Sequence, residues 1–138
     1  MWENVKIADI KESFWRPVMS QVSTPVVSEH RPWGSFTILG DYPDCKTKRL
    51  DILPGKRSSL QSHRHRTEHW IVVEGRALIT LNERVVEKKA GETVSVPCGT
   101  LHRIENPGCN MLSIIEVQLG DYFGEDDIVR YEDDFGRE

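Results

Sequence analysis

Four polar side chains in the middle of the chain have the residue types and the spacing of metal ligands. Gln61 and His63 are two positions apart on one extended segment, so both side chains point to the same face. A turn after His63 would bring Glu68 back on the adjoining strand, and His102 lies near the start of a later strand. Imidazole, amide and carboxylate groups together suit a divalent ion. Zinc is the first choice, with manganese, nickel, cobalt or iron as alternatives.

The elements that must position these ligands are short β-strands. Gly and Pro punctuate stretches rich in Val, Ile, Leu and Thr at intervals of about ten residues, a pattern typical of an all-β sandwich or barrel. The expected strands are Ser35–Leu39, Lys46–Leu53, Glu68–Val73, Arg76–Leu81, Thr93–Val96, His102–Glu105 and Met111–Leu119. Residues 1–29 are predicted to form an N-terminal arm or short helix, and residues 30–138 one domain. The acidic tail after residue 120 carries aromatic and aliphatic side chains, so we expect it to pack on the barrel.

Strand alternation indicates which polar groups point inward. Lys48 shares a strand face with two aliphatic residues, and Glu116 and Gln118 share a face with two others. If the aliphatic residues fill the barrel, these three polar side chains form a rim above an apolar core. Such a rim is where a small hydrophilic ligand would bind.

Composition limits the partners. A chain of 138 residues fits one domain, and it has no run of about 18 apolar residues for a membrane span. A net charge of −4 gives no long-range attraction to nucleic acid or to an anionic membrane, so an anionic ligand needs a local cluster of bases. The three cysteines show no CxxC spacing, and the N-terminus has neither a basic start nor an apolar run. We therefore expect a reduced, cytoplasmic protein.

The segments around the four ligands resemble the two motifs of the cupin fold. They read Gly55-x5-Gln61-x-His63-x4-Glu68-x6-Gly75 and Gly91-x5-Pro97-x-Gly99-x2-His102-x3-Asn106. Gln61 stands where the first motif usually has a histidine. The resemblance implies an all-β double-stranded β-helix, or jelly-roll barrel, with the ligands at one open end.

His65 is the alternative ligand, because it lies on the same face as His63 if the strand continues unbroken. If His63 and His65 were the ligand pair, only two residues would separate His65 from Glu68. Seven residues, instead of five, would then separate Gly55 from the first ligand. Both intervals fit the motif worse. We therefore prefer Gln61 as the ligand and place His65 beside the metal.

Four separated stretches sharpen the resemblance to the type II mannose-6-phosphate isomerase cupin. They are Arg31-Pro32-Trp33-Gly34, the segment from Ser59 to Trp70, the segment from His102 to Gly108, and Glu125-Asp126-Asp127-Ile128-Val129-Arg130. In that family the domain commonly forms the C-terminal part of a bifunctional enzyme with mannose-1-phosphate guanylyltransferase activity. Guanylyltransferase activity is not expected here, since 138 residues cannot hold an added α/β domain. Type I phosphomannose isomerases resemble this chain in binding zinc with one Gln, two His and one Glu.

The resemblance implies isomerisation of mannose 6-phosphate and fructose 6-phosphate through an enediol. A metal would act as a Lewis acid on the sugar oxygens, and a nearby base would move the proton; Lys48, Glu116 and His65 are the candidates. The phosphate needs cationic donors, and Arg66, Arg130 and Arg137 fall within the family motifs. Gln118 is expected to contact substrate at the rim. We also expect a homodimer, since cupins often pair through strand edges.

Three other functions remain open. A cupin oxygenase would hold iron, usually through three His and one Glu, and Gln61 argues against it. A nucleotide-sugar epimerase on this fold works without metal, and the intact ligand set argues against that. A binding module for sugar phosphates without turnover is the third alternative.

Overall fold

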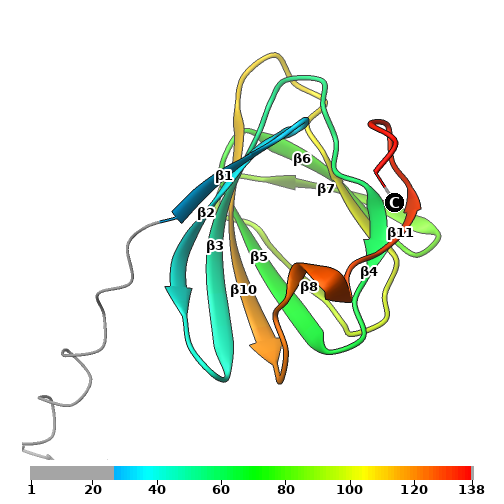
Figure 1. Cartoon of the computed structure of the whole chain (residues 1–138). Helices are drawn as coiled ribbons and strands as arrows, with labels where there is room; N and C mark the ends of the chain where they lie inside the picture. Colours follow the sequence, from blue (N-terminus) through cyan, green and yellow to red (C-terminus); the bar gives the residue numbers. More distant parts are fainter. Residues whose placement is uncertain (1–26, 138) are drawn as a thin grey trace, which may run out of the picture.

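The computed structural model describes residues 27–137, which form two antiparallel β-sheets curved around a central cavity (Figure 1). The six-stranded sheet has the order β1-β2-β3-β10-β5-β8, and the five-stranded sheet has the order β11-β4-β9-β6-β7. The bounds are β1 (Val27–Arg31), β2 (Gly34–Asp41), β3 (Cys45–Ile52), β4 (Leu60–Ser62), β5 (Arg66–Glu74), β6 (Arg76–Leu81), β7 (Arg84–Lys89), β8 (Thr93–Val96), β9 (His102–Glu105), β10 (Leu112–Gly120) and β11 (Val129–Glu132), with a 3-10 turn η3 (Glu125–Asp127) before the last strand.

The predicted all-β architecture is confirmed, and all seven expected strands are present as β2, β3, β5, β6, β8, β9 and β10. Four further strands, β1, β4, β7 and β11, were not predicted. The N-terminal arm was expected to extend to residue 29, and β1 begins at Val27, within that range. The boundary between arm and domain stays a prediction. The rest of the expected arm lies outside the described residues.

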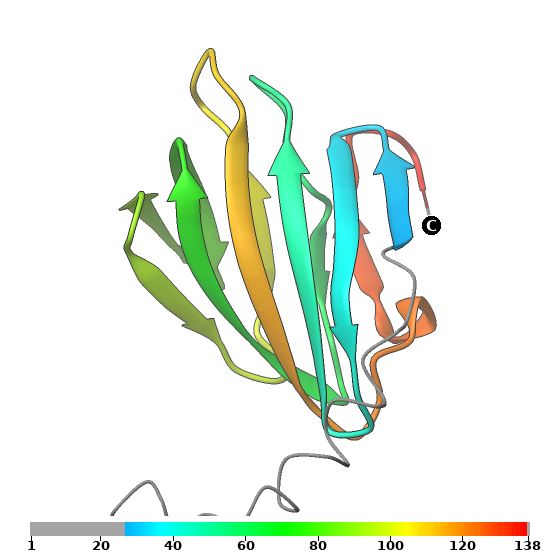
Figure 2. The ribbon, with the colours of Figure 1, turned by 90° about the vertical axis from the view of Figure 1, so that its left-hand side faces the viewer.

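Strand register divides the inside of the barrel into an apolar and a polar part. In the middle of the large sheet, Ile114 of β10 pairs with Leu50 of β3 on one side and Val72 of β5 on the other. Two residues further along β10, Glu116 pairs with Lys48 and with Trp70. Strands β3 and β10 therefore change from apolar to polar at this level, and β5 does so two residues further on, where Glu68 pairs with Gln118. Figure 2 shows the three strands side by side. The predicted inward orientation of Lys48, Glu116 and Gln118 is confirmed by their burial.

The apolar part is a continuous core contributed by both sheets. Its members are Trp33, Phe36, Leu50, Ile52, Trp70, Val72, Ala77, Ile79, Val96, Ile104, Leu112 and Ile114. The turn between β1 and β2 requires the glycine of the Arg-Pro-Trp-Gly stretch. Gly34 has a φ of 151°, and a Cβ there would lie 2.0 Å from the carbonyl oxygen of Asp51. This glycine lets β2 approach β3 and places Trp33 in the core.

The C-terminal segment, residues 121–137, packs on the barrel as expected. Phe123 is buried, and β11 pairs with β4 at the end of the smaller sheet (Figure 1, orange to red). The segment therefore borders the same cavity as the central strands. Among residues 27–137, no helix is long and apolar enough to cross a membrane.

Candidate metal centre

The structure brings together His63, Glu68 and His102, whose potential ligand atoms all lie within 4.8 Å of one another. Nε2 of His63 lies 3.1 Å from one carboxylate oxygen of Glu68, and Nε2 of His102 lies 3.7 Å from the other. All three side chains are buried. Two imidazoles and a carboxylate at this spacing can hold a divalent metal ion.

The protonation of the two imidazoles supports a metal between them. Nδ1 of His102 lies 2.8 Å from the carbonyl oxygen of Thr100, and Nδ1 of His63 lies 3.3 Å from that of Asp127. A carbonyl oxygen can only accept, so each Nδ1 carries a proton and each Nε2 is available to a metal. Burial lowers the pKa of His102 and outweighs the opposing negative charge of Glu68, which favours the neutral ring. Its buried Nε2 has no hydrogen-bond partner among the described residues, as expected for an atom that ligates a metal.

Glu68 is the carboxylate at the centre of the cluster. Burial opposes its negative charge, but the close contacts with His63 and His102 and the charge of Arg66 outweigh burial and lower the pKa of Glu68. Arg66 Nε donates to Glu68 at 3.1 Å, and its Nη2 lies 3.4 Å from Nε2 of His63. Arg66 was expected to hold a phosphate at the rim. It is buried against two metal-ligand candidates and also lines the cavity, so its role as a phosphate ligand stays a prediction.

Gln61, the fourth predicted ligand, lies directly opposite His102 in the pairing of β4 with β9, and it lines the same cavity. Its Oε1 accepts a hydrogen bond from Oγ of Ser59 at 2.8 Å. The structure thus places Gln61 beside the cluster, and its role as a ligand stays a prediction. His65 lies elsewhere: its side chain is 53% exposed and faces Asp121 and Tyr122 outside the cavity. The structure therefore does not bring His65 to the cluster, and its role as a base stays a prediction.

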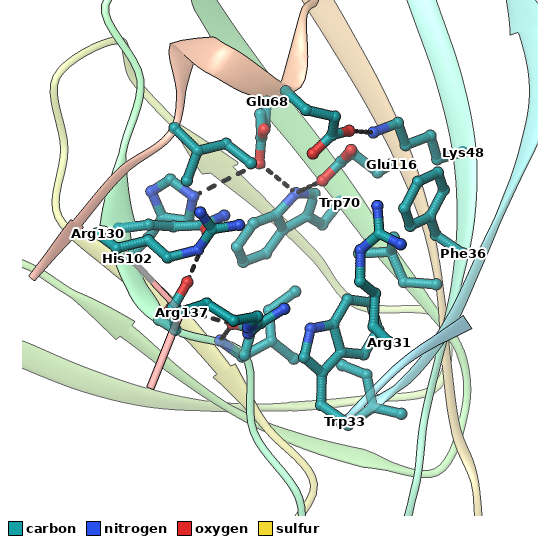
Figure 3. A pocket seen from close by; sticks show the side chains of 18 of the residues that line it. Arg31, Trp33, Phe36, Lys48, Glu68, Trp70, His102, Glu116, Arg130 and Arg137 are labelled. Atoms are coloured by element: carbon teal, nitrogen blue, oxygen red, sulfur yellow. Dashed lines mark hydrogen bonds and ion pairs between the residues drawn. The ribbon is translucent and has the colours of Figure 1, made fainter. Parts of the chain in front are cut away.

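A second carboxylate lies next to the cluster. Nε1 of Trp70 donates to both Glu68 and Glu116, at 3.1 Å in each case (Figure 3). Burial and the neighbouring negative charge of Glu68 raise the pKa of Glu116 to about 8. Gln118 was expected to contact substrate, but it is buried behind Glu116 and donates to that carboxylate at 2.6 Å. Gln118 therefore holds Glu116 in place.

Glu68 and His102 of the cluster, together with Glu116, border a cavity with an empty volume of about 630 Å³, including its open mouth. Positively charged side chains from four strands line its walls: Arg31 from β1, Lys48 from β3, Arg66 from β5 and Arg130 from β11 (Figure 3). Arg137, near the end of the chain, also lines it. All three predicted phosphate ligands, Arg66, Arg130 and Arg137, therefore line the cavity, and their role in binding phosphate stays a prediction. Lys48 forms an ion pair of 2.7 Å with Glu125.

Several site residues were missed in the sequence. Trp70 links two carboxylates, and this link depends on a pairing of β5 with β10 that spacing does not reveal. Asp127 is the clearest omission. Its carboxylate accepts from the backbone N–H groups of Arg64 and His65, and its carbonyl oxygen accepts from His63. The only signal was its place in the fourth family stretch.

Comparison with known sequences places this chain in a family. The model of the family described as mannose-6-phosphate isomerase C-terminal matches residues 20–133. The xanthan biosynthesis protein XanB of Xanthomonas campestris is 42% identical over 96% of this chain, and the alginate biosynthesis protein AlgA of Pseudomonas syringae is 46% identical over 78%. The mannose-1-phosphate guanylyltransferase ManC of Salmonella typhimurium is 43% identical over 78%. The chain spans 29%, 22% and 22% of these relatives, less than a third of each.

Solved structures agree on the fold. The capsular polysaccharide assembling protein CapF of Staphylococcus aureus superimposes with a TM-score of 0.68 at 24% identity, over 83% of this chain and 35% of CapF. An RmlC-like cupin of Shewanella frigidimarina superimposes with a TM-score of 0.65 at 20% identity, over 73% of this chain and 87% of that protein. The cupin fold expected from the two motifs is confirmed.

Proposed function

We propose that this chain, which belongs to the mannose-6-phosphate isomerase C-terminal family, interconverts mannose 6-phosphate and fructose 6-phosphate. The observation that carries the proposal is one cavity with both kinds of group that the reaction needs: a cluster able to ligate a metal, and positively charged walls. The reaction moves a proton between C2 and C1 of the open-chain sugar through an enediol. It needs no second substrate and no redox partner.

The buried cluster would hold the ion. His63, Glu68 and His102 would ligate it, with Gln61 near enough in the strand pairing to complete the set. Mixed nitrogen and oxygen donors make zinc our first choice. When bound, the ion would act as a Lewis acid on O1 and O2 of the sugar.

Glu116 is our candidate for the group that carries the proton. Its carboxylate lines the cavity beside Glu68 and is oriented by Trp70 and Gln118. It would take the proton from C2 of the aldose and return it to C1 of the enediol. Lys48 is less suited to this task, since its ammonium group is engaged by Glu125.

A coupled assay for fructose 6-phosphate tests the proposal. Protein stripped of metal by a chelator should be inactive, and reloading with zinc, manganese, cobalt, nickel or iron in turn should restore turnover with at least one ion. Glu116→Gln should keep the metal and lose about a hundredfold or more in kcat, as expected when a general base is removed. Glu74→Gln, an exposed carboxylate at the end of β5, is the matched control and should keep its activity.

Binding without turnover is the second candidate function. The relatives are much longer than this chain, so their activities do not by themselves carry over to it. Metal-loaded protein that binds mannose 6-phosphate but converts none of it in either direction would favour this alternative.

We also propose that the chain forms a homodimer through a strand edge. In the described part of the chain, β1 is the outermost strand of the larger sheet, and Val27 on it is 43% exposed. An edge strand offers backbone groups that a second copy can pair with. Light scattering that gives the mass of one chain at micromolar concentration would contradict the proposal. A location in the cytoplasm stays a prediction.

A further inference from the structure

A carboxylate from the C-terminal segment lies in the cavity against its buried ammonium group. Oε1 of Glu125, in η3, is 2.7 Å from Nζ of Lys48, and both residues line the cavity. Figure 3 labels Lys48 at the cavity wall. The Lys48 side chain is 6% exposed, whereas that of Glu125 is 47% exposed. An acid of the protein itself therefore neutralises a cation that an anionic ligand would otherwise contact.

Two further cations act on the same carboxylate. Burial opposes the charge of Glu125, but Lys48, Arg66 and Arg31 outweigh burial and lower its pKa. Lys48 Nζ lies 4.4 Å and Arg31 Cζ lies 4.9 Å from the centre of the Phe36 ring, so both cations border one aromatic side chain. Positive charge from β1, β3 and β5 thus converges on the place that Glu125 occupies.

The carboxylate of Glu125 is held less firmly than that of Asp133, another acid of the C-terminal segment. Asp133 accepts three hydrogen bonds from Arg137, at 2.7, 2.8 and 2.9 Å, and its side chain is 4% exposed. Among the described residues, the Glu125 side chain makes one hydrogen bond, to Lys48. Arg137 therefore has a fixed partner, whereas Lys48 can exchange its half-exposed partner for an incoming anion.

We propose that Lys48 and Arg31 form the subsite for the phosphate group of the ligand, and that Glu125 occupies this subsite in the free protein and leaves it when phosphate binds. Glu125 is then a specificity-determining residue, because only a strong anion can replace a carboxylate on Lys48. The identity of the sugar rests on the proposed function, but the phosphate subsite does not.

Calorimetric titration of metal-stripped protein tests the subsite without turnover. The probes are inorganic phosphate and mannose 6-phosphate, with unphosphorylated mannose as the negative control. Glu125→Gln should bind both phosphates about tenfold more tightly, because a negative charge a few ångströms from the incoming phosphate is removed. A variant that merely damaged the structure would bind more weakly, so a gain in affinity is diagnostic.

Two further variants complete the design. Glu132→Gln is the matched control: this acid lies on the same segment, pairs with Arg103 and does not line the cavity, so phosphate affinity should not change. Lys48→Gln should weaken phosphate binding at least tenfold, with Lys48→Arg restoring most of it and thermal melting showing that both variants fold.

Unchanged or weaker phosphate binding by Glu125→Gln would overturn the inference, as would Lys48→Gln with wild-type affinity. The result is separable from the proposed function. Tighter binding by Glu125→Gln without isomerisation by any metal-loaded form would keep the subsite and reject the isomerase. If the wild type isomerises the sugar phosphate and Glu125→Gln leaves phosphate affinity unchanged, the isomerase is kept and the subsite is rejected.

Discussion

The side chains of the site were only partly predictable one by one. Spacing identified His63, Glu68 and His102 because the short motif fixes their positions on neighbouring strands, and the structure gathers them. It could not reveal Trp70 as the donor shared by two carboxylates, or Asp127 as the partner of the loop after His63. Those contacts join segments far apart in the chain, and such contacts leave no periodic pattern in a single sequence.

The first prediction concerns the ligands themselves. Glu68→Ala and His102→Ala should each lose most of the bound metal, because each removes one of three converging donors. His65→Ala should retain it, since that exposed side chain faces Asp121 outside the cavity. Elemental analysis of the purified variants gives the metal content. A metal-free His65→Ala protein would return His65 to the ligand set.

At the level of elements, the seven strands with clear aliphatic content were predictable, and four others were not. β7 is largely charged and β4 has three residues, so neither shows the alternation that identifies a strand. β11 pairs with β4 at the edge of the smaller sheet and carries two charged side chains in four residues. These strands form through pairing with neighbours rather than through local propensity. Two of them, β4 and β11, carry Gln61 and Arg130 to the cavity.

Adjacent residues of β10 test the register that positions the site. Ile114 is fully buried between the sheets, whereas Ile115 points to the outer face and is partly exposed. Ile114→Ala should lower the free energy of unfolding by about 2–5 kcal/mol, because it leaves a cavity in the core. Ile115→Ala should cost clearly less. Chemical denaturation measures both, and equal losses would mean that β10 does not present alternate faces as described.

On the scale of the whole molecule, the C-terminal segment completes the wall of the cavity in the barrel. It contributes Glu125, Arg130 and Arg137 to the cavity wall, and Asp127 to the support of His63. The sequence predicted that this acidic tail packs on the barrel, from its aromatic side chains. It did not predict that the tail completes the cavity, since that depends on β11 pairing with β4.

The contribution of the end of this segment to the stability of the protein should depend on pH. The hydrogen bonds from Arg137 lower the pKa of Asp133 to about 2, from 3.8. A lowered pKa contributes stability that is fully present above 3.8 and is lost as the pH falls towards 2. Asp133→Asn should therefore destabilise the protein by about 1 kcal/mol at neutral pH. The difference in stability between Asp133→Asn and wild type should disappear near pH 2.

Thermal melting across this pH range gives the comparison. The neighbouring Asp134→Asn is the control, because Asp134 forms an exposed pair with Arg57 and should matter less. A difference between Asp133→Asn and wild type that persists unchanged to low pH would show that the ion pair does not stabilise the segment.

The central claim is that the metal cluster and the charged cavity together isomerise a sugar phosphate. Phosphorus NMR follows both sugar phosphates at once, so a single series started from each side tests it. Zinc-loaded protein should bring mannose 6-phosphate and fructose 6-phosphate to the same final mixture, and the chelated protein and His102→Ala should leave each unchanged. Bound but unconverted sugar phosphate in both directions, with the metal in place, would contradict the claim.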